Sequence, residues 1–234
     1  MKIIKITVFL YNYKKKIMAK KKEWREGEMI LTFNLTKIDT YYTPLMEEWL
    51  LISPAQFTPY EQTSFEHLLH KTHKVPIWSE ENLKMKFISP ILDLGQVLDS
   101  DRFVSFFDKP LAGEVEGYKL SVKADFLIAS GLLDYVKAPY FHFQEYKPQK
   151  NPTGDPMAQI LEAFLIARET NIKTGKNIPL YGCEIIGAQW KFVIMEDKTY
   201  CVSKTYDSTD KNDLLLIIAI LRKFKEILET RLLV

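Results

Sequence analysis

Apolar and polar positions divide the chain into stretches with a helical period and stretches with an extended one. The strongest helical pattern covers residues 210–230, where apolar residues recur every three or four positions. The residues of this stripe are Leu214, Leu215, Ile217, Ile218, Leu221, Phe224 and Leu228. A second pattern, over residues 156–170, follows Asp155, a favourable N-cap residue, and begins with Pro156. Both stretches are predicted to be amphipathic helices.

Three shorter helices are predicted in the first half of the chain. Residues 44–52 and 60–72 each begin after a Thr-Pro step, which is typical of a helix start. Residues 80–98 follow Ser79 as N-cap and carry two glutamates in the first turn, where the helix dipole favours negative charge. Pro90 lies inside this third helix and predicts a kink or a break there.

Short runs rich in aromatic and β-branched residues lie between these helices and predict strands. The runs are residues 102–107, 117–122, 125–129, 140–146, 180–188, 189–195 and 199–205. A further short strand is expected at residues 29–38, after a basic arm formed by residues 1–28. This order of elements predicts a mixed α/β (α+β) fold, a central sheet flanked by helices with an N-terminal helical region and a C-terminal helix.

Composition fits one ordinary soluble domain, which we expect to span residues 29–234. The chain has 234 residues, of which 47% are hydrophobic and 26% charged. The net charge of +2 is too small to indicate a nucleic-acid partner by itself. Cys183 and Cys201 have neither metal-binding nor redox spacing, so we expect buried thiols of a reducing cytoplasm.

The N-terminal segment does not have the pattern of a signal sequence or a membrane span. Residues 3–13 are apolar but are interrupted by Lys5 and Asn12, and the lysine clusters follow them instead of preceding them. The stretch is also too short and too polar to cross a membrane. Met18, followed by Ala-Lys-Lys-Lys, has the features of a natural start, which leaves open whether residues 1–17 are translated. We expect a cytoplasmic protein without a membrane partner.

Charged residues interrupt two consecutive predicted strands. Asp125 opens one strand, and Glu145 and Lys147 close the next. Positions i and i+2 of a strand share a face, so Glu145 and Lys147 lie together, and Asp125 reaches them if the strands pair as a hairpin. Two carboxylates and an ammonium can hold a hard divalent cation and handle a proton beside it. A solvated Glu–Lys pair at a strand end is the alternative interpretation.

These residues and their context resemble the PD-(D/E)XK nuclease superfamily, which has the restriction-endonuclease-like fold. The matching segments are Val122-Lys-Ala-Asp125-Phe-Leu-Ile, Phe143-Gln-Glu145-Tyr-Lys147 and Asp155-Pro-Met-Ala-Gln159-Ile-Leu-Glu-Ala163. The family's proline is Ala124 here, a departure that leaves the metal-ligand position intact. The αβββαβ core of the family corresponds to residues 79–195, roughly half of the chain.

The resemblance implies a Mg²⁺-dependent nuclease, with Mn²⁺ as a substitute metal and DNA as the first-choice substrate. Asp125 and Glu145 would bind the metal, with the carbonyl of Tyr146 as a third ligand. Lys147 would position the attacking water and offset the charge that develops on the phosphate. Gln159, one turn into the following helix, would orient the lysine or a water; an exposed helical glutamine is the simpler alternative.

A glutamate of the upstream helix is a further expected member of the site. At 100° per residue, Glu80 and Glu81 both border the apolar face of that helix, so spacing does not choose between them. The resemblance favours Glu80 because it follows Trp78. Glu61 and Glu66 of the preceding helix are further alternatives, and a charge that serves only the helix dipole is the simplest one.

Two other functions stay open. One is a catalytically inactive module that uses this fold to bind nucleic acid or protein, and the other is an RNA-directed phosphodiesterase. Cutting both strands of a duplex usually requires two sites, which favours a homodimer. The sequence contains no Gly-rich phosphate loop, nucleophile elbow or dinucleotide fingerprint, which argues against kinases, NTPases, serine hydrolases and Rossmann dehydrogenases.

Overall fold

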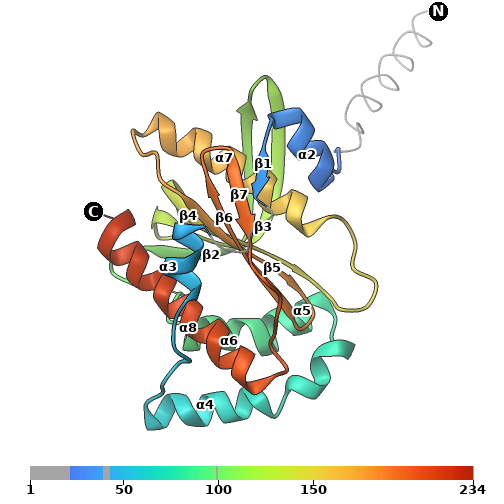
Figure 1. Cartoon of the computed structure of the whole chain (residues 1–234), viewed down its shortest axis with the longest axis vertical. Helices are drawn as coiled ribbons and strands as arrows, with labels where there is room; N and C mark the ends of the chain where they lie inside the picture. The colour runs from blue at the N-terminus through green and yellow to red at the C-terminus, as the bar shows by residue number, and fades with distance from the viewer. Residues whose placement is uncertain (1–21, 39–42, 99, 234) are drawn as a thin grey trace, which may run out of the picture.

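A mixed β-sheet runs through the centre of the molecule (Figure 1). The computed structural model describes residues 22–38, 43–98 and 100–233. The strands are β1 (Thr36–Ile38), β2 (Val104–Val115), β3 (Tyr118–Leu132), β4 (Tyr135–Lys147), β5 (Leu180–Ile186), β6 (Gln189–Glu196), β7 (Thr199–Val202) and β8 (Tyr206–Asp207). Their order is β1-β7-β6-β5-β4-β3-β2, with β8 paired to β6. The pairs β1–β7 and β4–β5 are parallel and the others antiparallel.

Helices cover both faces of this sheet. They are α2 (Glu26–Phe33), α3 (Pro44–Leu50), α4 (Pro59–Leu69), the 3₁₀ helix η1 (Thr72–Ile77), α5 (Glu80–Leu83), the π-helical turn η2 (Lys84–Ile88), α6 (Ser89–Leu94), α7 (Pro156–Lys173), α8 (Lys211–Ile227) and the π-helical turn η3 (Leu228–Leu232). Figure 1 shows α2 and α7 together at one end of the view and α3, α4, α6 and α8 together at the other. In the described part of the chain, no helix is long and apolar enough to span a membrane.

Two separate apolar clusters fill the space between the sheet and these two groups of helices. The cluster beneath α8 contains many aromatic rings among its aliphatic residues. In it, the indole of Trp49 contacts Tyr181 and Phe192 and donates to the carbonyl of Ile220. The cluster beneath α7 is more aliphatic and includes Leu161. The sheet therefore has both faces buried over much of its area, as expected for a mixed sheet between helical layers.

The predicted helices are confirmed, with their caps. Thr43, Thr58, Ser79 and Asp155 each accept a hydrogen bond from a backbone N–H in the first turn of the following helix. The helix predicted at residues 80–98 exists as α5, η2 and α6. The kink expected from Pro90 takes the form of a π-helical turn before it, since proline has no N–H to continue the regular hydrogen-bond ladder.

The strand predicted at residues 29–38 was wrong over most of its length. Residues 29–33 belong to α2 and are not extended; only residues 36–38 of the expected strand form one. Residues 26–28, the last three of the predicted basic arm, belong to α2. Residues 1–21 of that arm lie outside the described residues, together with the question of Met18. Met29 and Phe33 are four positions apart and both buried, which is a helical spacing, although the composition of this segment favoured a strand.

The strands before α7 were predicted too short. Apart from Gly117, the runs predicted at 117–122 and 125–129 are parts of one strand, β3. The strand expected at 102–107 begins at Val104 and continues as β2 to Val115. Pro110 does not end β2, because β2 is the last strand of the sheet and its outer edge needs no ladder hydrogen bonds. The hairpin expected between the strands of Asp125 and Glu145 is confirmed as the antiparallel pair β3–β4.

Both strands of the β2–β3 ribbon change face near Asp125. Ala124 packs in the cluster beneath α7, whereas Phe126, only two residues on, packs in the cluster beneath α8. The register passes from Phe107↔Phe126 to Lys109↔Ala124, and Asp108 between them has a left-handed φ of 53°. A regular strand would keep positions 124 and 126 on one face. The break frees the side chains at 108 and 125 from both apolar layers.

Candidate functional site

The candidate site lies where β3 and β4 stop pairing. Their antiparallel register ends at Phe126↔Gln144, and the carboxylate of Asp125 lies in the fork beyond that pair. Asp125 Oδ2 accepts the backbone N–H of Tyr146 at 2.8 Å. Because Asp125 thereby satisfies a buried backbone donor, its position is fixed directly beside the residue that separates Glu145 from Lys147.

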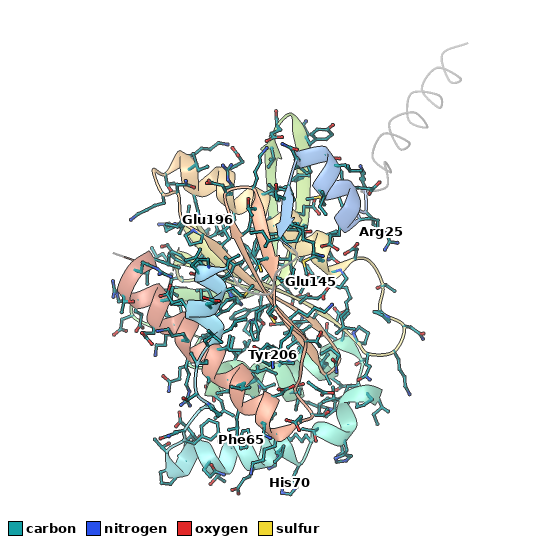
Figure 2. All side chains as sticks on the ribbon, viewed as in Figure 1. Arg25, Phe65, His70, Glu145, Glu196 and Tyr206 are labelled. Atoms are coloured by element: carbon teal, nitrogen blue, oxygen red, sulfur yellow. The ribbon has the colours of Figure 1, made fainter. Side chains whose placement is uncertain are left out.

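Glu145 and Lys147 lie side by side at the end of β4. Lys147 Nζ donates to Glu145 Oε1 at 2.5 Å and to the carbonyl of Tyr146 at 3.1 Å. Asp125, Glu145 and Lys147 are 3%, 3% and 7% exposed, so this is a buried polar group and not a solvated ion pair at a strand end. Figure 2 labels Glu145 near the centre of the molecule. The structure thus brings together the three residues that the sequence singled out.

A second lysine, Lys84 of η2, enters the site from the opposite face of the sheet. Its ammonium lies 3.5 Å from Asp125 Oδ1 and 3.1 Å from Asp108 Oδ1. Lys123 Nζ donates to the same Asp108 oxygen at 2.8 Å, but from solvent. Lys84 also lies above the ring of Tyr146, 5.7 Å from its centroid. The site therefore contains two buried ammonium groups, one on each side of Asp125.

Of the four upstream glutamates, Glu80 is the one that the fold places within reach of these charges. It is half-buried in the first turn of α5, and the charges of Lys147, Asp125 and Lys84 all act on it. Glu81, one position on, is exposed, and of the charges that act on Lys84 those of Asp125 and Asp108 come before that of Glu81. Glu61 forms an ion pair with Arg222 at 2.7 Å, and Glu66 accepts from Gln62 on the surface of α4. The Glu61–Arg222 ion pair joins α4 to α8, and the Glu66–Gln62 hydrogen bond lies within α4.

Gln159 borders a pocket that opens beside Lys147. The pocket has a volume of about 360 Å³ and is lined by residues of β3, β4, α7 and the segment that precedes α2. They are Lys22, Glu23, Trp24, Val122, Lys147, Thr153, Gly154, Asp155, Gln159 and Glu162. The N-cap of α7 places Gln159 one turn into the helix, as expected, with its side chain at the pocket wall. Gln159 and Lys147 therefore line the same pocket.

Burial and neighbouring charge set the protonation of the site. Burial, with a smaller contribution from the charge of Asp125, raises the pKa of Glu145 to about 8, against the lowering effect of Lys147. Burial also raises the pKa of Glu80. For Lys84, burial acts to lower the pKa, but the carboxylates of Asp125 and Asp108 outweigh burial and the pKa is raised. Glu145 and Glu80 therefore have too little positive charge around them to ionise as readily as exposed glutamates. Lys84, in contrast, keeps its positive charge.

The donor set is suited to a cation that keeps water ligands. Within the described ranges, no group of three or more His, Cys, Asp or Glu side chains is arranged to hold a metal ion. The donors available are the carboxylates of Asp125 and Glu145 and the carbonyl of Tyr146, which also accepts from Lys147. Mg²⁺ is commonly bound by one or two carboxylates, with water and substrate oxygens completing its shell. The residues present are compatible with that cation and not with a fully protein-ligated zinc site.

Comparison with known proteins leaves the site to be interpreted from its own chemistry. No protein-family model matches the chain, and no significant match is found among curated proteins. The geometry and charge of the residues described above therefore carry the functional argument.

Two members of the site were missed at the level of sequence. Lys84 follows Glu80 by four positions, so helical spacing puts both on one side of the helix, and this signal could have been used. Asp108 gave no comparable signal, since it stands between an aromatic run and Lys109-Pro110. Only the pairing of β2 with β3 brings it opposite Asp125.

Proposed function

We propose that this chain is a metal-dependent nuclease that hydrolyses phosphodiester bonds, with DNA as its substrate. The observation that carries the proposal is the buried contact set formed by Asp125, the Tyr146 backbone, Glu145 and Lys147 in the fork between β3 and β4. Burying two carboxylates with an ammonium is costly unless the charges are compensated. A phosphodiesterase has a use for such an arrangement, because its substrate and metal ion supply the missing partners.

The topology supports the resemblance to the restriction-endonuclease-like fold. The segment from α5 to β5 runs helix, three antiparallel strands, helix, strand, and β5 returns parallel to β4. We infer that this segment is the αβββαβ core, with α2 to α4 as an added N-terminal region and α8 as a C-terminal helix. The site residues sit on its second and third strands, Asp125 within β3 where its pairing with β4 stops, and Glu145 and Lys147 at the end of β4.

The protein groups divide the work of hydrolysis in this proposal. A bound Mg²⁺, held by Asp125 and Glu145, would polarise the phosphoryl oxygen and lower the pKa of a water. The Tyr146 N–H fixes Asp125, and Glu145 fixes the ammonium of Lys147, which is then positioned to hold the attacking water. Gln159, which lines the same pocket as Lys147, would orient that water, and Glu80 would add a carboxylate within reach of the charge of Lys147. Burial of these groups strengthens each interaction relative to water.

Cleavage assays on several substrates test this proposal and separate it from its alternatives. The full chain is incubated with end-labelled duplex DNA, single-stranded DNA and RNA, with Mg²⁺, Mn²⁺ or a chelator. We expect cleavage of DNA that requires metal and falls by about 100-fold or more in Asp125→Asn, which keeps an acceptor for the Tyr146 N–H but loses the charge. Cleavage of RNA alone would favour an RNA-directed phosphodiesterase, and binding without cleavage would favour a catalytically inactive module.

A further inference from the structure

Lys84 is buried, and a buried ammonium destabilises the folded protein unless its charge is compensated. Its side chain is 4% exposed, and it starts the π-helical turn in which the N–H of Ser89 donates to the Lys84 carbonyl. Phe87 and Ile88 of the same turn are fully buried. π-helical turns of this kind are frequent at functional sites, where an extra residue redirects a side chain. Here the turn places a charged side chain on the buried side of the helix.

The ammonium of Lys84 lies between two carboxylates of different strands. Asp108 Oδ1 is 3.1 Å away on β2, and Asp125 Oδ1 is 3.5 Å away on β3. The other oxygen of Asp125 accepts the Tyr146 N–H, so the two oxygens of this carboxylate already have different partners. Glu145 and Lys147 lie beyond that N–H, on the β4 side of the fork. Positive charge thus approaches Asp125 from two directions.

We propose that the ammonium of Lys84 takes the place of a second divalent cation, so that this site binds one metal ion per chain. The inference rests on the proposed function. Phosphodiesterases with two metal ions hold them about 3.5–4 Å apart, commonly bridged by a carboxylate. In this chain Asp125 Oδ1, which would otherwise be free to bind a second ion, lies 3.5 Å from the Lys84 ammonium, and a fixed ammonium repels a divalent cation there. Lys84 is a positioning residue: it orients Asp125 and supplies permanent positive charge next to it.

Metal stoichiometry tests this proposal independently of activity. Titration calorimetry with Mn²⁺, supported by counting bound Mn²⁺ by electron paramagnetic resonance, is carried out on wild type, Lys84→Met and Lys123→Met. Methionine keeps the length of the lysine stem without its charge. Lys123 is the matched control, because it shares the Asp108 oxygen with Lys84 but is 59% exposed and reaches the site from solvent.

We expect one Mn²⁺ per chain for wild type and for Lys123→Met, and two for Lys84→Met, in which Asp108 and Asp125 lose their buried counter-ion. Thermal unfolding keeps the test valid if Lys84→Met is unstable: Mn²⁺ should then raise the Tm of Lys84→Met more than that of wild type. Two Mn²⁺ in wild type, or one in Lys84→Met with no larger Tm rise, would overturn the inference and leave the nuclease proposal intact. No Mn²⁺ bound by wild type would overturn the proposed function itself.

Discussion

Asp125 and Glu145 are equally buried carboxylates in very different surroundings. Asp125 receives a backbone N–H and the ammonium of Lys84, so its charge is compensated within the protein. Glu145 has Lys147 as its partner, and burial together with the charge of Asp125 raises its pKa to about 8. The charge of Asp125 thus already has partners within the protein, whereas Glu145 becomes a full anion near neutral pH when positive charge is added beside it. A cation bound between them would provide that charge.

His142 shows the effect of burial without compensation. Its ring lies among Trp49, Phe126 and Phe224, its Nε2 is 2.9 Å from Gln144 Nε2, and its Nδ1 has no hydrogen-bond partner among the described residues. Burial lowers the pKa of His142 from 6.5 to about 3. The histidine is therefore neutral in the folded protein at pH values well above 3.

The free energy of unfolding should decrease as the pH is lowered, because His142 is buried and neutral in the folded protein. The unfolded chain binds a proton at this residue below about pH 6.5, while the folded protein does not do so until about pH 3. The contribution is thus fully present above pH 6.5 and is lost as pH falls toward 3, at up to about 1.4 kcal/mol per pH unit. Urea unfolding at pH 7, 6 and 5 should show a steeper loss for wild type than for His142→Gln. Equal slopes would mean that His142 is protonated in the folded protein.

At the scale of elements, Asp155 joins two helices that are distant in sequence. Its Oδ1 accepts the Ala158 N–H at the start of α7, and its Oδ2 accepts the Glu26 N–H at the start of α2. One carboxylate therefore caps two helix N-termini, where the dipoles of both favour a negative charge. This contact also places the segment that precedes α2 along the wall of the pocket beside Lys147.

Removing this double cap should loosen α2 more than α7. Asp155→Ala is expected to cost about 1–2 kcal/mol of the free energy of unfolding, and Asp155→Asn less, because the amide retains one acceptor. Hydrogen exchange should become faster at the first turn of α2, since α7 is still held by its buried apolar face. Uniform destabilisation with unchanged exchange in α2 would contradict a capping role for Asp155 there.

Short sequence signals were sufficient to predict where the helices start, but not how far the strands extend. Thr-Pro steps, Ser79 and Asp155 identified helix starts because capping depends on residues within one turn. The length of β2 depends on its edge position, which makes Pro110 acceptable, and no short stretch of sequence shows which strand is at the edge. The helical state of residues 29–33 likewise depends on packing of Met29 and Phe33 in the cluster beneath α7.

At the scale of the whole molecule, the site is assembled from both faces of the sheet. The alternation of Glu145 and Lys147, and the hairpin that brings Asp125 to them, follow from period-two geometry and could be predicted. The helical spacing of Glu80 and Lys84 placed both on one side of a helix. The entry of Lys84 into the site from the other face of the sheet could not be predicted, because it requires the change of face near Asp125 and the π-helical turn before Pro90. Both features are irregularities that tertiary packing produces and that local patterns do not specify.

The central claim is that this assembly is a metal-dependent hydrolytic centre with Lys147 as its water-positioning group. The most direct test is the single-turnover rate of plasmid DNA cleavage in Mg²⁺ for wild type, Lys147→Met and Lys137→Met. Lys137 lies on the same strand but is exposed at its far end, so it controls for the general loss of a lysine from β4. We predict metal-dependent cleavage that falls by about 100-fold or more in Lys147→Met and is retained in Lys137→Met. Equal rates in Lys147→Met and wild type, with folding unchanged, would contradict this assignment.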